Sequence, residues 1–88
     1  GYFALLHLIA TPGQMALLLA AGRRQAGLTQ AQAAARVGIS QSRISALETD
    51  AAAITLAQLL ALCGAYGLQL QVRDKNQPVS DPAPLIEW

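Results

Sequence analysis

The hydrophobic positions between residues 12 and 67 recur with the period of α-helices, and the breaks in this pattern coincide with helix-capping residues. Thr11 and Pro12 predict the start of a first helix, because threonine caps free backbone N–H groups and proline has the φ angle of a first helical residue. This helix should run to about residue 26 and end at Gly27. Its buried face should carry Met15, Leu18, Leu19 and Gly22.

Two capping boxes predict the starts of two further helices. Thr29 with Gln32 opens a short helix that should end near residue 37, and Thr55 with Gln58 opens one that ends at Gly67. The apolar stripe of the helix after Thr55 should comprise Leu56, Leu59, Leu60, Cys63 and Tyr66.

Another helix should lie between these two. Gly38 permits a sharp left-handed turn, and Ser40 then caps a helix that runs to about residue 49. Ile44 and Leu47 should face inward from it. We expect residues 50–53 to form a loose connection to the next helix.

From residue 68 the pattern changes to strict alternation, with Leu68, Leu70 and Val72 separated by polar residues. This predicts a half-buried strand over residues 68–73. Its backbone groups need a partner, which is either the apolar run over residues 2–9 or the same strand of a second chain, and we favour the second chain. The chain therefore divides into an apolar extension (1–10), a helical domain (11–67), a dimerisation strand (68–73) and a tail (74–88) that holds three of the four prolines.

Composition indicates one folded domain that associates with a second chain. The 88 residues are 53% hydrophobic and 12% charged. A single domain of this size buries only part of its apolar surface, so a second chain should cover the rest. The net charge is +1, but all arginines of the helical domain precede the first acidic residue, Glu48, which leaves a basic region in the first half.

Several classes of protein are disfavoured by what the chain contains. Cys63 is alone, which excludes a disulfide framework and favours a reducing cytoplasm. The apolar run over residues 2–9 is too short to span a bilayer, so we expect a soluble protein with no membrane partner. His7 and Cys63 are too few for a metal site, and no nucleophile with its base, carboxylate pair or phosphate-binding glycine loop points to an enzyme or a cofactor.

Two short helices joined by a tight glycine-containing turn form the unit that places its second helix in the major groove of DNA. The helix after Ser40 carries suitable polar side chains. Arg43 can donate two hydrogen bonds to guanine, and Gln41 can pair with adenine. Each such contact discriminates between bases by about 1–3 kcal/mol.

The motifs Gly27-Leu28-Thr29-Gln30, Val37-Gly38-Ile39-Ser40 and Ile44-Ser45-Ala46-Leu47-Glu48 resemble, in sequence and spacing, the lambda-repressor and Cro-like (XRE) family. The resemblance implies a mainly α helix-turn-helix bundle of four or five helices. It places Gln30 and Gln41 at the two helix-start positions that contact phosphate and base, with Ser42, Arg43 and Ser45 exposed along the recognition helix. We expect base contacts from Ser40, Gln41, Ser42, Arg43 and Ser45, and phosphate contacts from Arg24, Thr29, Gln30 and Arg36. The resemblance also implies a structural ion pair between Arg23 and Glu48.

The chain departs from the XRE pattern at Gly22 and Ala33, where that family carries larger aliphatic residues. We therefore expect either a looser core or one that another chain fills.

Outside the helical domain, the strand, the proline-containing tail and the terminal Trp88 resemble HipB-type antitoxins. This resemblance implies strands paired across a dimer, repression of the chain's own operon at a palindromic operator, and a tail that docks onto a HipA-type Ser/Thr kinase toxin. The docking residues would be Leu85, Ile86 and Trp88.

Alternatives remain for the function and for individual residues. The chain could be a free-standing or phage-type repressor without a toxin, or an interaction module that neutralises a toxin without binding DNA. The arginines, glutamines and serines singled out above could be plain solvated surface, and Leu70 and Val72 could pack on their own helices.

Overall fold

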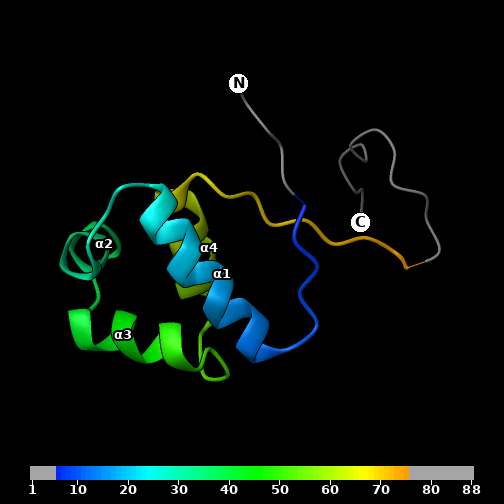
Figure 1. Ribbon diagram of the computed structural model, residues 1–88, viewed down its shortest axis with the longest axis horizontal. Coiled ribbons are helices and arrows are strands. Elements are labelled where there is room, and N and C mark those ends of the chain that lie inside the picture. The colour runs from blue at the N-terminus through cyan, green and yellow to red at the C-terminus, as the bar shows by residue number, and fades with distance from the viewer. Residues whose placement is uncertain (1–5, 76–88) are drawn as a thin grey trace.

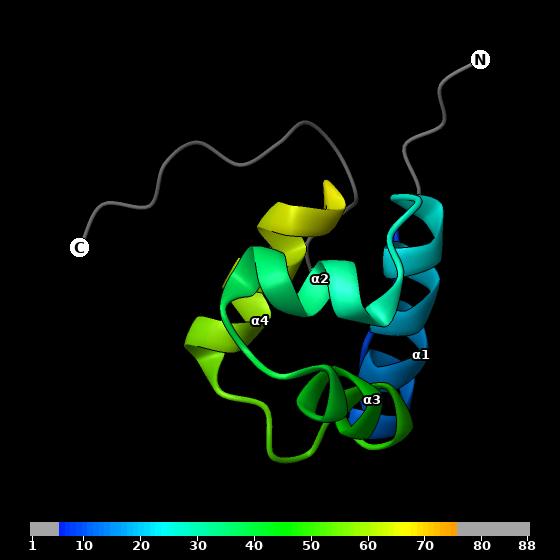
Figure 2. The ribbon, with the colours of Figure 1, turned by 90° about the vertical axis from the view of Figure 1, so that its left-hand side faces the viewer.

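The computed structural model describes residues 6–75, and these residues form four helices: α1 (Pro12–Gln25), α2 (Gln30–Val37), α3 (Gln41–Thr49) and α4 (Leu56–Tyr66). Helices α1 and α4 pack against each other, α3 packs on α1 and α2, and α2 also packs on α4 (Figures 1 and 2). The segments that precede α1 and follow α4 both leave the bundle on the side away from α2 (Figure 1). No helix in this part of the chain has the length and apolar character needed to cross a membrane.

Side-chain caps start all four helices, as the sequence predicts. The hydroxyls of Thr29 and Thr55 accept from the backbone N–H three residues later, and the glutamine at that position returns a bond to the cap residue. Thr11 does the same with Gln14, a reciprocal box that sequence analysis assigned only as a simple cap. These bonds satisfy backbone donors that would otherwise lack partners in the first turn.

The core lies where the four helices meet. The largest fully buried side chains are Leu19, Ile44, Leu47 and Leu62. Ala33 of α2 is completely buried against them, so its small side chain lets α2 approach its neighbours closely. The predicted inward face of α3 is confirmed, because Ile44 and Leu47 are each 1% exposed.

The predicted apolar stripe of α4 is wrong at two positions. Leu56 and Leu60 are 66% and 50% exposed, whereas Leu62, which the prediction omitted, is buried. Since α4 is apolar on nearly every side, its sequence has no polar face from which the inward direction can be inferred.

Gly22 does not loosen the core, contrary to the expectation from sequence. A Cβ atom built at Gly22 would lie 3.0 Å from Leu68 Cδ1 and 3.4 Å from Tyr66 Cδ2. The space that a larger residue would occupy is therefore filled by Tyr66 and Leu68 of the same chain.

The connection over residues 50–53 is more ordered than predicted. Asp50 Oδ1 accepts from the Ala52 backbone N–H at 2.9 Å, the Ile54 N–H donates to the Ala51 carbonyl at 3.1 Å, and Ala51 is buried. This turn therefore holds α3 and α4 at a defined separation.

The predicted strand over residues 68–73 is not present in this single chain. Within residues 6–75, the segment after α4 forms no strand, and its backbone bonds to the bundle come from Gly67 and Leu68, whose N–H groups both donate to the Cys63 carbonyl, Leu68 at 2.8 Å. Leu70 and Val72 are 44% and 89% exposed, so the alternative in which they pack on their own helices is wrong for this segment.

Candidate nucleic-acid interface

Helices α2 and α3 are joined by a short turn whose backbone is fixed at both ends. Gly38 has φ 75°, in the left-handed region where only glycine is unstrained, and its N–H donates to the Ala34 carbonyl. The Ile39 N–H donates to the same carbonyl at 3.1 Å. Ser40 then caps α3, with its hydroxyl 3.0 Å from the Arg43 N–H. The orientation of α3 relative to α2 is thus set by hydrogen bonds and not by packing alone.

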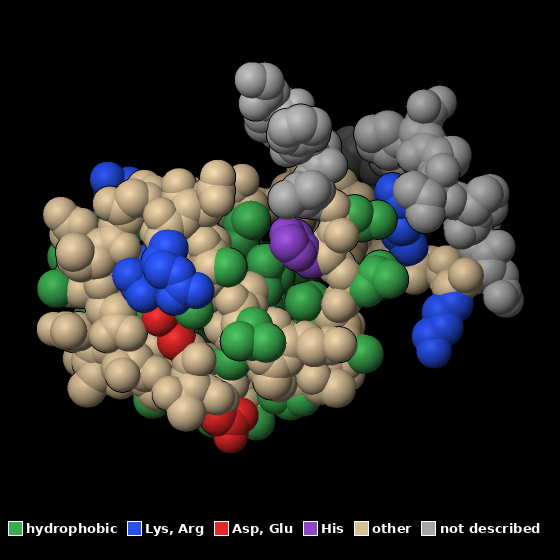
Figure 3. All heavy atoms as spheres, viewed as in Figure 1, with side chains coloured by type: hydrophobic (Ala, Val, Ile, Leu, Met, Phe, Trp, Pro, Cys, Tyr) green, Lys and Arg blue, Asp and Glu red, His purple; other side chains and the backbone are tan. Residues whose placement is uncertain are grey.

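The outer edge of α3 carries no charged side chain, and four of its five exposed residues are polar. While Ile44 and Leu47 anchor the helix in the core, the opposite side is exposed and comprises Gln41, Ser42, Ser45, Ala46 and Thr49. On the view in Figure 3, the surface over α3 is mostly tan, the colour of the backbone and of side chains that are neither hydrophobic nor charged. We define these five exposed residues as the α3 edge. Such a surface can donate and accept hydrogen bonds at base edges without attracting the duplex strongly from a distance.

Three of the predicted base-contact residues, Ser40, Ser42 and Arg43, already have partners in the protein. The Ser40 hydroxyl is occupied by the cap and lies 3.1 Å from the Ser42 hydroxyl. Nη2 of Arg43 donates to the Ala53 carbonyl and to Gln58 Oε1, both at 3.0 Å. In the sequence, Gln58 stands out only as part of a capping box, and no sequence signal indicates that Arg43 reaches it.

The structure brings the expected ion pair together. Arg23 Nε lies 2.7 Å from Glu48 Oε2, and Arg23 Nη2 donates to Glu48 Oε1 at 3.1 Å. Arg23 Nη1 also donates to the Leu28 carbonyl, and Gln30 Nε2 donates to Glu48 Oε1 at 3.2 Å. The side chains of Arg23 and Glu48 are 12% and 9% exposed. This network joins α1 to α3 and to the start of α2, and so stabilises the helix-turn-helix unit.

The hydrogen bond from Arg23 to Glu48 raises the pKa of the guanidinium above its ordinary value. Burial opposes this effect, while the negative charge of Glu48 adds to it. Arg23 is therefore permanently charged in the folded protein, as a structural cation must be.

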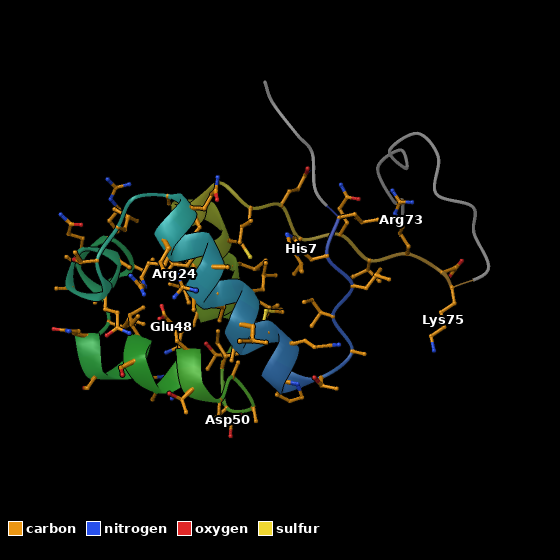
Figure 4. All side chains as sticks on the ribbon, viewed as in Figure 1. His7, Arg24, Glu48, Asp50, Arg73 and Lys75 are labelled. Carbon is orange, nitrogen blue, oxygen red and sulfur yellow. The ribbon has the colours of Figure 1, made fainter. Side chains whose placement is uncertain are left out.

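The predicted phosphate-contact residues fall into two groups. Thr29 and Gln30 are engaged within the protein, Thr29 in its capping box and Gln30 with Glu48. Arg24 and Arg36 are exposed. Arg24 lies at the end of α1 on the same face as Glu48, whereas Arg73 lies beyond the bundle on the segment after α4 (Figure 4).

Two further expectations concern other kinds of site. The predicted toxin-docking residues Leu85, Ile86 and Trp88 lie outside the described residues. Within residues 6–75, no group of three or more His, Cys, Asp and Glu side chains is arranged to hold a metal ion.

The chain matches a known family and several solved structures. The helix-turn-helix family HTH_3 matches residues 19–72. One solved structure is a HipB–O4 20mer complex, and its matching chain is 28% identical to this protein. The match has a TM-score of 0.72 and covers 81% of this chain and 100% of that chain. A HipA–HipB–O2–O3 complex gives the same identity, TM-score and coverage.

One further solved structure is more distantly similar to the chain, and one comparison found no match. A restriction-modification controller protein matches with a TM-score of 0.62 at 17% identity, over 66% of this chain and 75% of that chain, which shows a shared fold alone. No curated protein matches the chain.

Proposed function

Because the chain belongs to the HTH_3 helix-turn-helix family, whose members are DNA-binding regulators and not enzymes, we propose that it is a HipB-type transcriptional repressor that inserts α3 into the major groove of a palindromic operator. The observation that carries this proposal is the two-sided character of α3. Its inner side is anchored by Ile44 and Leu47, and its outer side is exposed and able to form hydrogen bonds.

In this proposal, the α3 edge reads the bases. Gln41 at the first position of α3 reaches deepest and pairs with adenine, while Ser42 and Ser45 bind donors or acceptors of neighbouring pairs. Ser40 contributes through the cap that orients this end of the helix. Arg24 and Arg36 bind phosphates, and Thr29 and Gln30 place the α2 N–H groups beside the DNA backbone.

We also propose that the protein is a homodimer. The outward side of α4 contains no polar side chain, and its exposed residues are Leu56, Ala57, Leu60, Ala61 and Gly64. We define them as the α4 face. The segment over residues 69–72, which follows α4, has exposed apolar side chains and, among the described residues, no backbone hydrogen-bond partners. A second copy offers both an equivalent apolar face and an equivalent edge with which these backbone groups can pair.

The antitoxin part of the proposal rests on the solved HipA–HipB complex. The match covers 100% of the chain in that structure and 81% of this chain, at 28% identity. We propose that a HipA-type Ser/Thr kinase is the partner, docked by the tail that ends in Leu85, Ile86 and Trp88.

Selection from a pool of random DNA duplexes tests the repressor function. We expect the protein to enrich an inverted repeat with half-sites about one helical turn apart. A protein that enriches no sequence, yet binds the kinase, would instead be the interaction module. Kinase binding is assayed for the chain with and without residues 76–88. A protein that enriches an inverted repeat but binds no kinase in either form would be a free-standing repressor.

A further inference from the structure

Arg43 is tied to the protein in a way that conflicts with a role in reading bases. A guanidinium recognises guanine with two parallel N–H groups, either from both terminal nitrogens or from Nε with Nη2. The second arrangement is the one Arg23 uses toward Glu48 in this protein. Nη2 takes part in both arrangements. In Arg43, Nη2 already donates to the Ala53 carbonyl and to Gln58 Oε1, which accounts for both of its hydrogens.

The contacts of Arg43 join α3 to α4, two helices that are otherwise connected mainly through α1 and α2. Helix α3 packs mainly on α1 and α2, and α4 packs on the same two helices. Arg43 lies in the first turn of α3, Gln58 lies in the first turn of α4, and Ala53 lies in the turn that connects them. The side chain of Arg43 is therefore a direct link between the helix proposed to read DNA and the helix that carries the α4 face.

Gln58 is held rigidly at its end of this link. Its backbone N–H donates to Thr55 Oγ1 at 3.0 Å, and its Oε1 accepts from the Thr55 N–H at 3.3 Å as well as from Arg43. The capping box thus fixes the acceptor in place before Arg43 binds it. Both Arg43 and Gln58 are half-buried, which strengthens the charge-assisted bond relative to one in open water.

We propose that Arg43 is a positioning residue that fixes α3 relative to α4, and that it does not read bases. This inference rests on the proposed repressor function, because its consequence is for DNA binding. In a dimer formed through the α4 face, the angle between α3 and α4 sets the separation of the two α3 edges. Loss of the link therefore weakens binding to every sequence alike, whereas loss of a base contact changes the preference at one position.

A double-mutant cycle on the free protein tests the link without DNA. We expect Arg43→Ala to lower the midpoint of thermal unfolding by about 4–8 °C, the shift typical of one net charge-assisted hydrogen bond in a domain of this size. Gln58→Ala should also lower it, and the double variant should lower it by less than the sum of the two. Strictly additive shifts would overturn the inference.

Selection from random duplexes then separates positioning from reading. Arg43→Ala should enrich the same sequence as the wild type, with affinity reduced about 5- to 150-fold for all sequences tested, the range typical of a loss of coupling between sites. Gln41→Ala is the matched control on the α3 edge and should lose the preference at one position of each half-site. Loss of a guanine preference in Arg43→Ala would overturn the inference. If the wild type enriched no sequence, the proposed repressor function would be wrong. The double-mutant cycle measured by thermal unfolding would still decide whether Arg43 holds α3 to α4.

Discussion

At the scale of single residues, the strongest electrostatic feature is the pair between Arg23 and Glu48. Arg23→Ala leaves the Glu48 carboxylate nine-tenths covered and without its cation. We expect a loss of roughly 3 kcal/mol in the free energy of unfolding, because removal of one member of a covered pair costs more than the net value of the pair. Urea denaturation measures this loss. The neighbouring exposed Arg24→Ala should change the same quantity by less than about 0.5 kcal/mol, and equal effects of the two variants would contradict the assignment.

Two buried groups in α4 predict a loss of stability at alkaline pH. Burial raises the pKa of the Cys63 thiol above its ordinary 9.0, and burial is also the main cause that raises the pKa of Tyr66 above 10.0. The folded state therefore holds both protons more tightly than the unfolded state. Their contribution to stability is fully present below pH 9 and is lost as the pH rises through the folded-state pKa values.

Urea midpoints measured between pH 7 and pH 11 test this pH dependence. They should stay constant to about pH 9 and then fall, with the fall starting later in Cys63→Val because the group that titrates first is absent. A midpoint that rises between pH 9 and pH 11 would contradict the burial of these groups.

At the scale of elements, the helix boundaries follow from local chemistry that a sequence displays. The hydroxyls of Thr29 and Thr55 and the left-handed Gly38 and Gly67 act on neighbours a few residues away, so their positions predict where α2 and α4 start and end. The spacing of Ile44 and Leu47 likewise predicts the orientation of α3, because polar residues occupy its other side.

The parts that sequence did not predict depend on contacts between distant residues. Exposure of Leu60 and burial of Leu62 follow from how α4 sits against α1 and α2, which an apolar helix does not encode in its own periodicity. The hydrogen bond from Arg43 to Gln58 joins two helices. The sequence distinguishes Gln58 only by its place in a capping box. Residues 68–73 have the alternation of a strand, but a strand forms only where a partner supplies its hydrogen bonds.

The α4 face and the segment after it make a testable prediction about self-association. Leu60→Asp places a charge in the middle of the α4 face and should weaken dimerisation at least tenfold, since a charge buried at an interface without a partner is costly. Val72→Pro removes a backbone N–H and should weaken it through the strand pairing. Sedimentation equilibrium measures both effects. Ala35→Asp on the exposed side of α2 is the control, and a dimer that Leu60→Asp leaves intact would contradict the proposed interface.

At the scale of the whole molecule, the charges set how the protein can bind DNA. The net charge is only +1, and Arg24 and Arg36 are the exposed arginines of the helical bundle proposed to bind phosphates. Arg73 and Lys75 lie beyond the bundle on the segment after α4 (Figure 4). A dimer would thus neutralise about four phosphates, and its affinity should fall with salt with a logarithmic slope of about −4. Hydrogen bonds from the α3 edge must then contribute much of the specific affinity.

The most direct test of the account is a binding titration with the duplex that the wild type selects. The variant Gln41→Ala/Ser42→Ala/Ser45→Ala alters only exposed side chains of the α3 edge, so its thermal midpoint should remain close to that of the wild type. We predict that it binds the selected duplex no better than a scrambled one, while the wild type prefers the selected duplex by at least 1,000-fold, in the range of specific DNA-binding proteins. A folded triple variant that retains the wild-type preference would contradict the claim that α3 reads DNA.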